Sequence, residues 1–204
     1  MRELSLNVLD IAQNSIVAGA SLTEILVKEN TEENTLLIGI YDNGKGMTPE
    51  QVENVKDPFF TTRTTRKVGM GIPLFKLAAE QTGGSFTITS QVGVGTRVDA
   101  LFKTDSIDFT PLGDMASTIA TIVSMNEDKD FVYTRIIDGK KFEFKSSDIK
   151  KILDGVPLSE PSVMNWIEDY IRENTVLIER NEGYEITRRV TCYKRKSTGS
   201  DVCS

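Results

Sequence analysis

The run Asp42-Asn43-Gly44-Lys45-Gly46-Met47 constrains this chain most, because it places a carboxylate and two glycines between a strand and a helix. The apolar, β-rich stretch 35–41 before it predicts a buried strand. After it, Thr48 can cap a helix, Pro49 suits the first helical position and Gln51 completes a capping box. The carboxylate therefore stands at the end of a buried strand, where the glycines let a ligand approach the backbone.

Two interpretations of this run remain open when it is taken alone. A buried carboxylate costs free energy unless hydrogen-bond donors meet it, and the exocyclic amine of a purine is such a donor. An Asp-Gly turn on the surface has the same local sequence and needs no ligand. The rest of the chain has to decide between a ligand site and a turn.

The N-terminal segment 2–17 is apolar nearly all round, which is typical of a buried helix. Asn7, Asp10 and Asn14 form a polar stripe along one face of that helix. The stripe is either a solvated edge or a set of ligand-binding groups. Its narrowness favours ligand binding.

The segment 58–67 shows no helix or strand pattern and is rich in threonine and basic residues, among them Arg63 and Lys67. Hydroxyl, guanidinium and ammonium donors suit a triphosphate, although an ordinary solvated basic loop has the same composition. Gly69 and Gly71 follow and can open backbone N–H groups toward phosphate. A helix predicted over 74–81 would direct its N-terminus to the same place.

Two further strands are predicted over 85–90 and 96–102, with a turn at 91–95. Thr96 opens the second strand, and we expect it near Asp42 across the sheet. Residues 1–104 are interpreted as one domain.

The sequence pattern of strands separated by glycine-rich turns ends at residue 104. A helix is predicted over 115–124, a hairpin around Asp138-Gly139, and two more helices over 146–153 and 161–173 with Trp166 in the core. We interpret 105–175 as a small α+β appendage and 176–204 as a basic tail that is expected to be mobile. The tail is either a partner-docking strand or a solvated end, and the solvated end is preferred.

Composition excludes several classes of function. The chain has 204 residues and a net charge of −6, which argues against general nucleic-acid binding. No run of eighteen apolar residues predicts a membrane span, and no signal peptide is expected at the start. Two cysteines, Cys192 and Cys203, lack zinc or disulfide spacing, so a cytoplasmic location is expected. With no histidine, this chain holds no histidine metal site and no phosphoacceptor histidine.

Four blocks in order carry a resemblance to a known family. They are the helix with Asp10 and Asn14, the run 42–47, the segment 58–63 and the segment 69–74, and the Gly93-Val94-Gly95-Thr96 turn adds a further match. Together they resemble the GHKL superfamily (DNA gyrase, Hsp90, histidine kinases and MutL) over residues 2–103. The resemblance implies a two-layer α/β sandwich, the Bergerat ATP-binding fold, that binds ATP and Mg²⁺.

The resemblance also implies a role for each matching residue. Asn14 would hold Mg²⁺ through its amide oxygen. Asp10 falls where active members usually carry a glutamate base, and it is one methylene shorter, which puts turnover in question because about 1 Å can cost on the order of 10²-fold in rate. The nucleotide site would further comprise Asp42, Gly44, Gly46, Met47, Arg63, Lys67, Gly69, Gly71 and Thr96.

The chain is most similar to small stand-alone histidine-kinase-like proteins of anaerobic bacteria, often encoded beside iron-only hydrogenase subunits. That likeness implies a protein partner, either a hydrogenase-related redox complex or a response protein. The expected function is Mg·ATP binding, with action as a protein kinase in trans or a slow ATPase. The alternatives are a nucleotide-sensing regulatory subunit without turnover and an interaction domain with an empty pocket. A lysine from the appendage, such as Lys140 or Lys141, could also reach the γ-phosphate.

Overall fold

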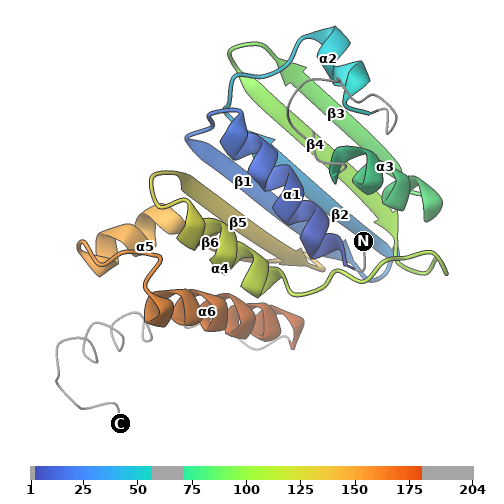
Figure 1. The fold of residues 1–204 in the computed structure, drawn as a ribbon. Helices are drawn as coiled ribbons and strands as arrows, with labels where there is room; N and C mark the ends of the chain where they lie inside the picture. The colour runs from blue at the N-terminus through green and yellow to red at the C-terminus, as the bar shows by residue number, and fades with distance from the viewer. Residues whose placement is uncertain (1–2, 57–70, 181–204) are drawn as a thin grey trace.

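The computed structural model describes residues 3–56 and 71–180, and Figure 1 shows their arrangement. The elements in chain order are α1 (Leu4–Val17), β1 (Leu22–Asn30), β2 (Thr35–Asp42), α2 (Pro49–Asn54), α3 (Gly71–Gln81), β3 (Ser85–Gln91), β4 (Gly95–Lys103), α4 (Met115–Met125), β5 (Asp130–Ile137), β6 (Lys140–Lys145), α5 (Ser146–Leu153) and α6 (Pro161–Glu179).

One six-stranded sheet organises the molecule, in the order β3-β4-β2-β1-β5-β6. All neighbouring strands are antiparallel except β1 and β5, which run parallel. The helices α3, α1, α4 and α6 lie side by side across one face of the sheet (Figure 1). No element between residues 3–56 and 71–180 covers the other face. This confirms the expected two-layer α/β sandwich.

Strand alternation decides which side chains meet the helices. On β2, Leu36, Ile38 and Ile40 are buried under the helix layer, and Asp42 continues the same face to the end of the strand. The register sets Asp42 opposite Thr23 of β1 and Thr96 of β4. The covered face of the sheet is therefore apolar along its length and polar at the end where β2 runs into the glycine loop.

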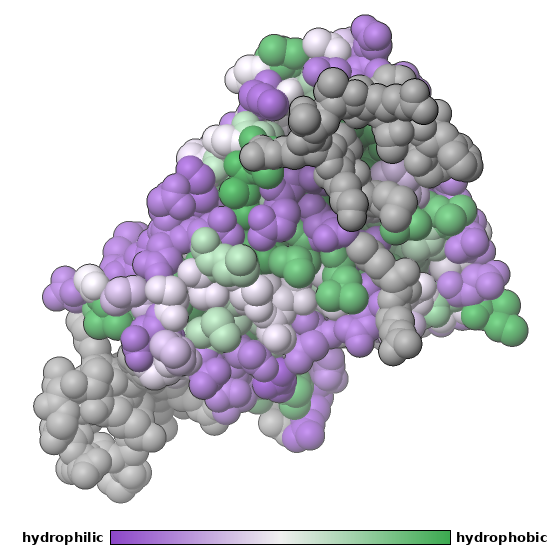
Figure 2. All heavy atoms as spheres, in the orientation of Figure 1, coloured by the Kyte–Doolittle hydropathy of each residue, from purple (hydrophilic) through white to green (hydrophobic). Residues whose placement is uncertain are grey.

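The outer surface of the helix layer is mostly hydrophilic, as Figure 2 shows, with separate apolar areas. Its exposed apolar side chains include Leu6 and Val17 of α1, Leu77 of α3 and Met125 of α4. Apolar residues scattered singly are normal on a soluble domain. No helix within the described ranges has the length and apolar character that crossing a membrane requires.

The strands and helices expected from the first half of the chain are confirmed within a few residues. Thr48 and Gln51 form the predicted capping box, with Thr48 Oγ1 accepting from Gln51 N and Gln51 Oε1 accepting from Thr48 N. The helix expected over 74–81 begins earlier, at Gly71. The helix expected over 161–173 continues to Glu179, because Ile178 is buried in the core and extends its apolar face.

The segment 105–175 does not stand apart from the rest. Its hairpin, β5–β6, joins the main sheet through the parallel pairing of Leu22 with Asp130 onward. Its helices α4 and α6 continue the helix layer, and their apolar residues belong to the same buried core as those of α1. The division into domains at residue 104 stays a prediction, but neither the sheet nor the core divides there.

Trp166 is half-buried and stacks on Tyr170 with ring centroids 5.2 Å apart. It packs against the core from α6, as expected. The tail beyond Arg180 lies outside the described residues.

Candidate functional site

The carboxylate of Asp42 is held from two sides at the end of β2. Its Oδ1 accepts a hydrogen bond from Gly44 N at 2.9 Å, and its Oδ2 accepts one from Ser15 Oγ at 3.0 Å. One donor comes from the glycine loop and the other from helix α1. Because each oxygen keeps room for another donor, a ligand with an N–H group can bind a carboxylate whose position is already set.

The loop that follows Asp42 is tied to the elements on both sides. Asn43 Oδ1 accepts from the N–H groups of Ser21 and Leu22, each at 2.9 Å. Lys45 N donates to Ala18 O at 3.0 Å. Met47 N donates to Ser90 Oγ at 2.8 Å. The loop is therefore a fixed part of the fold that connects α1, β1 and β3.

Two glycines allow this loop to contact the β3–β4 turn through backbone atoms. Gly46 has φ 66°, and a Cβ there would lie 1.9 Å from Gln91 O. Gly95 has φ 138°, and a Cβ there would lie 1.9 Å from Asp42 O. A side chain at either position would collide with backbone, so both positions require glycine.

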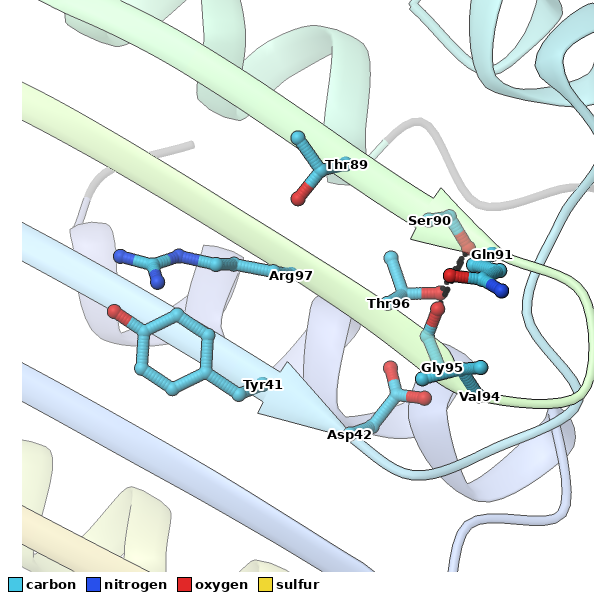
Figure 3. Close-up of a pocket in the computed structure, with 9 residues that line it drawn as sticks. All are labelled: Tyr41, Asp42, Thr89, Ser90, Gln91, Val94, Gly95, Thr96 and Arg97. Atoms are coloured by element: carbon cyan, nitrogen blue, oxygen red, sulfur yellow. Dashed lines mark hydrogen bonds between the residues drawn. The ribbon is translucent and has the colours of Figure 1, made fainter.

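Thr96 lies opposite Asp42 on β4, as the sequence predicted. Its hydroxyl is 3.0 Å from Ser90 Oγ, and Ser90 Oγ also donates to Gly95 O at 2.9 Å. The hydrogen bond between Thr96 and Ser90 is drawn in Figure 3. Ser90 therefore links the turn, the glycine loop and Thr96.

Asp10 and Asn14 present polar side chains from helix α1. Both are partly exposed, and neither side chain has a hydrogen-bond or ion-pair partner among residues 3–56 and 71–180. Burial raises the pKa of the Asp10 carboxyl. The first residue of α3 lies close by, since a Cβ on Gly71 would be 2.8 Å from the Asp10 Cβ.

The polar stripe on α1 is not a solvated edge along its whole length, because Asn7 is 2% exposed. The described residues hold no group of three acidic, cysteine or histidine side chains that could bind a metal by themselves. Asn14 offers an amide oxygen that has no partner within residues 3–56 and 71–180. This suits an ion such as Mg²⁺, which takes one or two protein oxygens and completes its shell with waters and phosphates.

A shallow hollow of about 500 Å³ opens at the same end of the sheet (Figure 3). Tyr41, Thr89 and Arg97 line it. Tyr41 and Arg97 alternate with Asp42 and Thr96, and Thr89 alternates with Ile88 and Ser90, so all three point to the uncovered face. Asp10 and Asn14 do not line it. The hollow therefore lies across the sheet from the polar groups of α1. Its full lining is Tyr41, Asp42, Thr89, Ser90, Gln91, Val94, Gly95, Thr96 and Arg97.

A small cluster on the uncovered face borders this hollow. Tyr41 Oη donates to Asp99 Oδ1 at 2.7 Å, and the Arg97 guanidinium lies 4.6 Å from the centre of the Tyr41 ring. Arg97 Nε also donates to Asp99 Oδ2 at 2.6 Å. Burial and the neighbouring Asp99 raise the pKa of Tyr41 to about 12.

The structure brings together most of the predicted site residues that it describes. Asp42, Gly44, Gly46, Met47 and Thr96 surround the end of β2. Asp10 and Gly71 lie at the α1–α3 contact, and Asn14 follows Asp10 one turn further along α1. Arg63, Lys67 and Gly69 were also predicted, but they lie outside the described residues. Lys140 and Lys141 are far from the site, because β6 starts at the opposite end of the sheet, about 20 Å along the strands.

Sequence reasoning missed two serines. Ser15 follows Asn14 but faces the buried side of α1, where it binds Asp42. Ser90 occupies an inward position of β3, on the same face as Ile88. A hydroxyl at a position where strand alternation predicts an apolar residue was the available signal for Ser90.

With this geometry in place, comparison with known proteins identifies the class. Residues 1–106 match the family described as "Histidine kinase-, DNA gyrase B-, and HSP90-like ATPase". The chain belongs to this family, which confirms the resemblance to the GHKL superfamily. Its first half is a GHKL ATP-binding domain like those of histidine kinases.

Among individual proteins, the chain is 35% identical over 101 residues to the sensor protein SrrB of Staphylococcus aureus. The aligned region covers 47% of this chain and 17% of SrrB. It is 27% identical over 107 residues to a putative sensor histidine kinase NtrY-like of Rickettsia bellii, covering 52% of this chain and 17% of that protein. The chain thus spans less than a fifth of the length of these relatives. A solved structure, the Aquifex aeolicus MutL ATPase domain complexed with ADP, is similar with a TM-score of 0.43 and 16% identity, covering 74% of this chain and 67% of that one.

Proposed function

We propose that this protein binds Mg·ATP and transfers the γ-phosphoryl group to another protein or, slowly, to water. The observation that carries this proposal is the carboxylate of Asp42, held at the end of β2 by donors from α1 and from the glycine loop. A carboxylate so placed accepts a hydrogen bond from the 6-amino group of adenine. Gly44 and Gly46 keep the loop beside it free of side-chain bulk, and Met47 closes the loop against β3.

In this proposal, helix α1 serves the triphosphate end of the nucleotide. Asn14 would offer its amide oxygen to Mg²⁺, and the ion would neutralise charge on the phosphate oxygens. The described part of the chain offers no acidic cluster for the ion, so metal binding would depend on the nucleotide. The basic residues Arg63 and Lys67, with Gly69 and Gly71, are proposed to meet the phosphates.

Asp10 is the proposed base. Phosphoryl transfer needs mainly positioning and charge neutralisation, with a group that orients the attacking hydroxyl or water. Burial raises the pKa of Asp10, which makes this carboxylate a better proton acceptor. It has no partner among the described residues that would have to be displaced first.

The acceptor of the phosphoryl group is proposed to lie on another molecule. This chain contains no histidine, so it cannot phosphorylate itself on that residue. A partner protein or water is then the acceptor. The proposal includes a cytoplasmic location, where ATP is available, and makes no use of nucleic acid.

A second function is a nucleotide-sensing subunit that binds ATP without turnover and signals to a partner. The observation that favours it is the length of Asp10, one methylene shorter than the glutamate implied by the family resemblance. Such a shortening can disable catalysis while the adenine and phosphate contacts remain. The partner would then respond to the nucleotide state and not to a phosphoryl group.

Calorimetric titration with ATP and ADP, with and without Mg²⁺, tests the binding proposal. We expect ATP binding that is tighter with Mg²⁺ in the wild type, and an Asn14→Ala variant that loses more affinity with Mg²⁺ than without it. Gln13→Ala, a neighbouring polar change on α1, is the control and should keep the wild-type metal effect. Absence of ATP binding by the wild type contradicts the proposal.

A phosphate-release assay on the same sample then separates the two functions. Slow release that Asp10→Asn abolishes supports the enzyme, whereas no release with intact binding supports the sensor. Incubation with γ-labelled ATP should leave no acid-labile, base-stable label on this chain. Rapid release without a partner would contradict the claim that turnover alone is slow.

A further inference from the structure

We propose that Ser15 is a positioning residue that sets the plane of the Asp42 carboxylate and so determines how well the site selects a 6-amino purine. This inference rests on the proposed nucleotide function and assigns a role to a residue that is not among the predicted site residues. The contact that carries it is the 3.0 Å hydrogen bond from Ser15 Oγ to Asp42 Oδ2.

The proton of the Ser15 hydroxyl has two acceptors within reach. One is Asp42 Oδ2 at 3.0 Å, and the other is Ile11 O at 3.4 Å, one turn back on α1. A carboxylate oxygen is the stronger acceptor, and Ile11 O already lies in the helical position to accept the backbone N–H of Ser15. The hydroxyl proton therefore goes to Asp42. Ser15 is 2% exposed, so water does not compete for it easily.

The carboxylate would be less well oriented without this contact. Gly44 N holds only Oδ1, and the terminal torsion of an aspartate has a broad, two-fold energy profile. A donor on the second oxygen removes that freedom. Because the second donor comes from α1, the plane of the carboxylate is set by the same helix that carries Asn14, the proposed metal ligand.

A simple packing role for Ser15 makes a different prediction. If the hydroxyl only filled space in α1, its loss would weaken all nucleotides alike, since every nucleotide would meet the same loosened helix. If it positions Asp42, its loss weakens only those nucleotides whose base donates to Asp42. Purine riboside triphosphate lacks the 6-amino group and retains the sugar and phosphates, so it separates the two roles.

The test is calorimetric titration of the full chain with ATP and with purine riboside triphosphate, both with Mg²⁺. We expect Ser15→Ala to lower the ATP affinity about tenfold, the effect of one lost hydrogen bond to a charged group. Its affinity for purine riboside triphosphate should change less than about twofold, since that ligand makes no such bond. Ser5→Ala is the matched control, because Ser5 is also a buried serine of α1 but bonds Glu3.

Two further variants test whether Ser15 affects ATP affinity through Asp42. In an Asp42→Asn background, Ser15→Ala should leave the ratio of the two affinities unchanged. Ser15→Cys keeps a side chain of similar size with a weak donor, so its ratio of ATP affinity to purine riboside triphosphate affinity should lie between those of the wild type and Ser15→Ala. The cysteine variant replaces the alanine variant if Ser15→Ala does not fold.

The role of Ser15 is overturned if Ser15→Ala loses affinity equally for both nucleotides, or if the folded variant binds ATP as tightly as the wild type. In both cases the proposed function still stands, provided that the wild type binds ATP. A wild type that binds neither nucleotide overturns the proposed function and the role of Ser15 with it.

Discussion

The two faces of the sheet use the same strands for different purposes, and β4 shows the difference most directly. Val98, Ala100 and Phe102 point into the helix layer and are fully or almost fully buried. Arg97 and Asp99, which alternate with them, belong to the polar cluster with Tyr41 on the uncovered face. Position in the alternation, and not residue type, therefore decides whether a polar side chain can serve the candidate site.

Two aspartates make the same contrast between the faces. Asp42 is held by Ser15 and Gly44 under the helix layer, beside the groups on α1. Asp99 is held by Tyr41 and Arg97 on the uncovered face. Both carboxylates are well bonded, so their location, and not their bonding, separates the proposed adenine-binding residue from Asp99.

The largest expected effect tests the core under the covered face. Phe102→Ala should lower the free energy of unfolding by about 3–5 kcal/mol, because Phe102 is 0% exposed and packs on Phe75 at 5.5 Å between ring centroids. Its neighbour Leu101 is half-buried on the other face, and Leu101→Ala should cost only about 1 kcal/mol. Urea unfolding measures both. Equal losses would mean that the uncovered face is packed as tightly as the core.

Asp42→Asn should weaken ATP binding by about 1.5–3 kcal/mol, because an amide donor replaces part of a charged acceptor. Asp99→Asn is the matched change on the other face and should leave ATP affinity within about 0.5 kcal/mol of the wild type. Calorimetry measures both affinities, and circular dichroism checks the fold. Normal ATP binding by a folded Asp42→Asn variant would show that Asp42 does not bind adenine.

Two glycines extend the comparison of the two faces to the backbone. Gly46→Ala should lower the free energy of unfolding by about 1–3 kcal/mol and abolish nucleotide binding, since its Cβ would meet Gln91 O and its φ is 66°. Gly39→Ala on the uncovered face should cost about 1 kcal/mol and leave nucleotide binding intact, because its Cβ meets the side chains of Tyr41 and Asp99, which have to shift, and no backbone atom. Thermal melting and titration of the same samples check this. Loss of ATP binding in Gly39→Ala would show that the two faces are coupled.

The smallest effect concerns Asp10 and its dependence on pH. Burial raises the pKa of Asp10, so the folded state is less favourable to the charged form than the unfolded state is. The resulting cost is present at neutral pH, above the folded pKa, and disappears as the pH falls below the unfolded value near 3.8. Asp10→Asn should therefore raise the melting temperature slightly at pH 7, and the gain should vanish near pH 4. A gain that grows as the pH falls would contradict this account.

Local patterns in the sequence were enough to predict much of the fold. The capping box at Thr48 and Gln51 and the strand before Asp42 follow from neighbouring residues alone. The pairing of Asp42 with Thr96 needed the family resemblance as well, because no local pattern fixes which strands are neighbours.

Contacts between distant segments account for what was missed. Ser15 gains its importance only when α1 lies over the end of β2, and the cluster of Tyr41, Arg97 and Asp99 forms only when β4 pairs with β2. The parallel pairing of β1 with β5 is equally invisible in either strand. These features depend on the topology, which periodicity does not encode.

The central place of β1 has a consequence for how the chain folds. One neighbour, β2, follows it through a short hairpin, but the other, β5, is synthesised only after five more of the described elements, α2 to α4, have been completed. Until then β1 presents a row of unpaired N–H and C=O groups that can pair with another chain. A chain cut after residue 106, where the family match ends, would keep that edge permanently. The ATP-binding half is thus defined by its sequence family, but the protection of its sheet against aggregation comes from the half that follows.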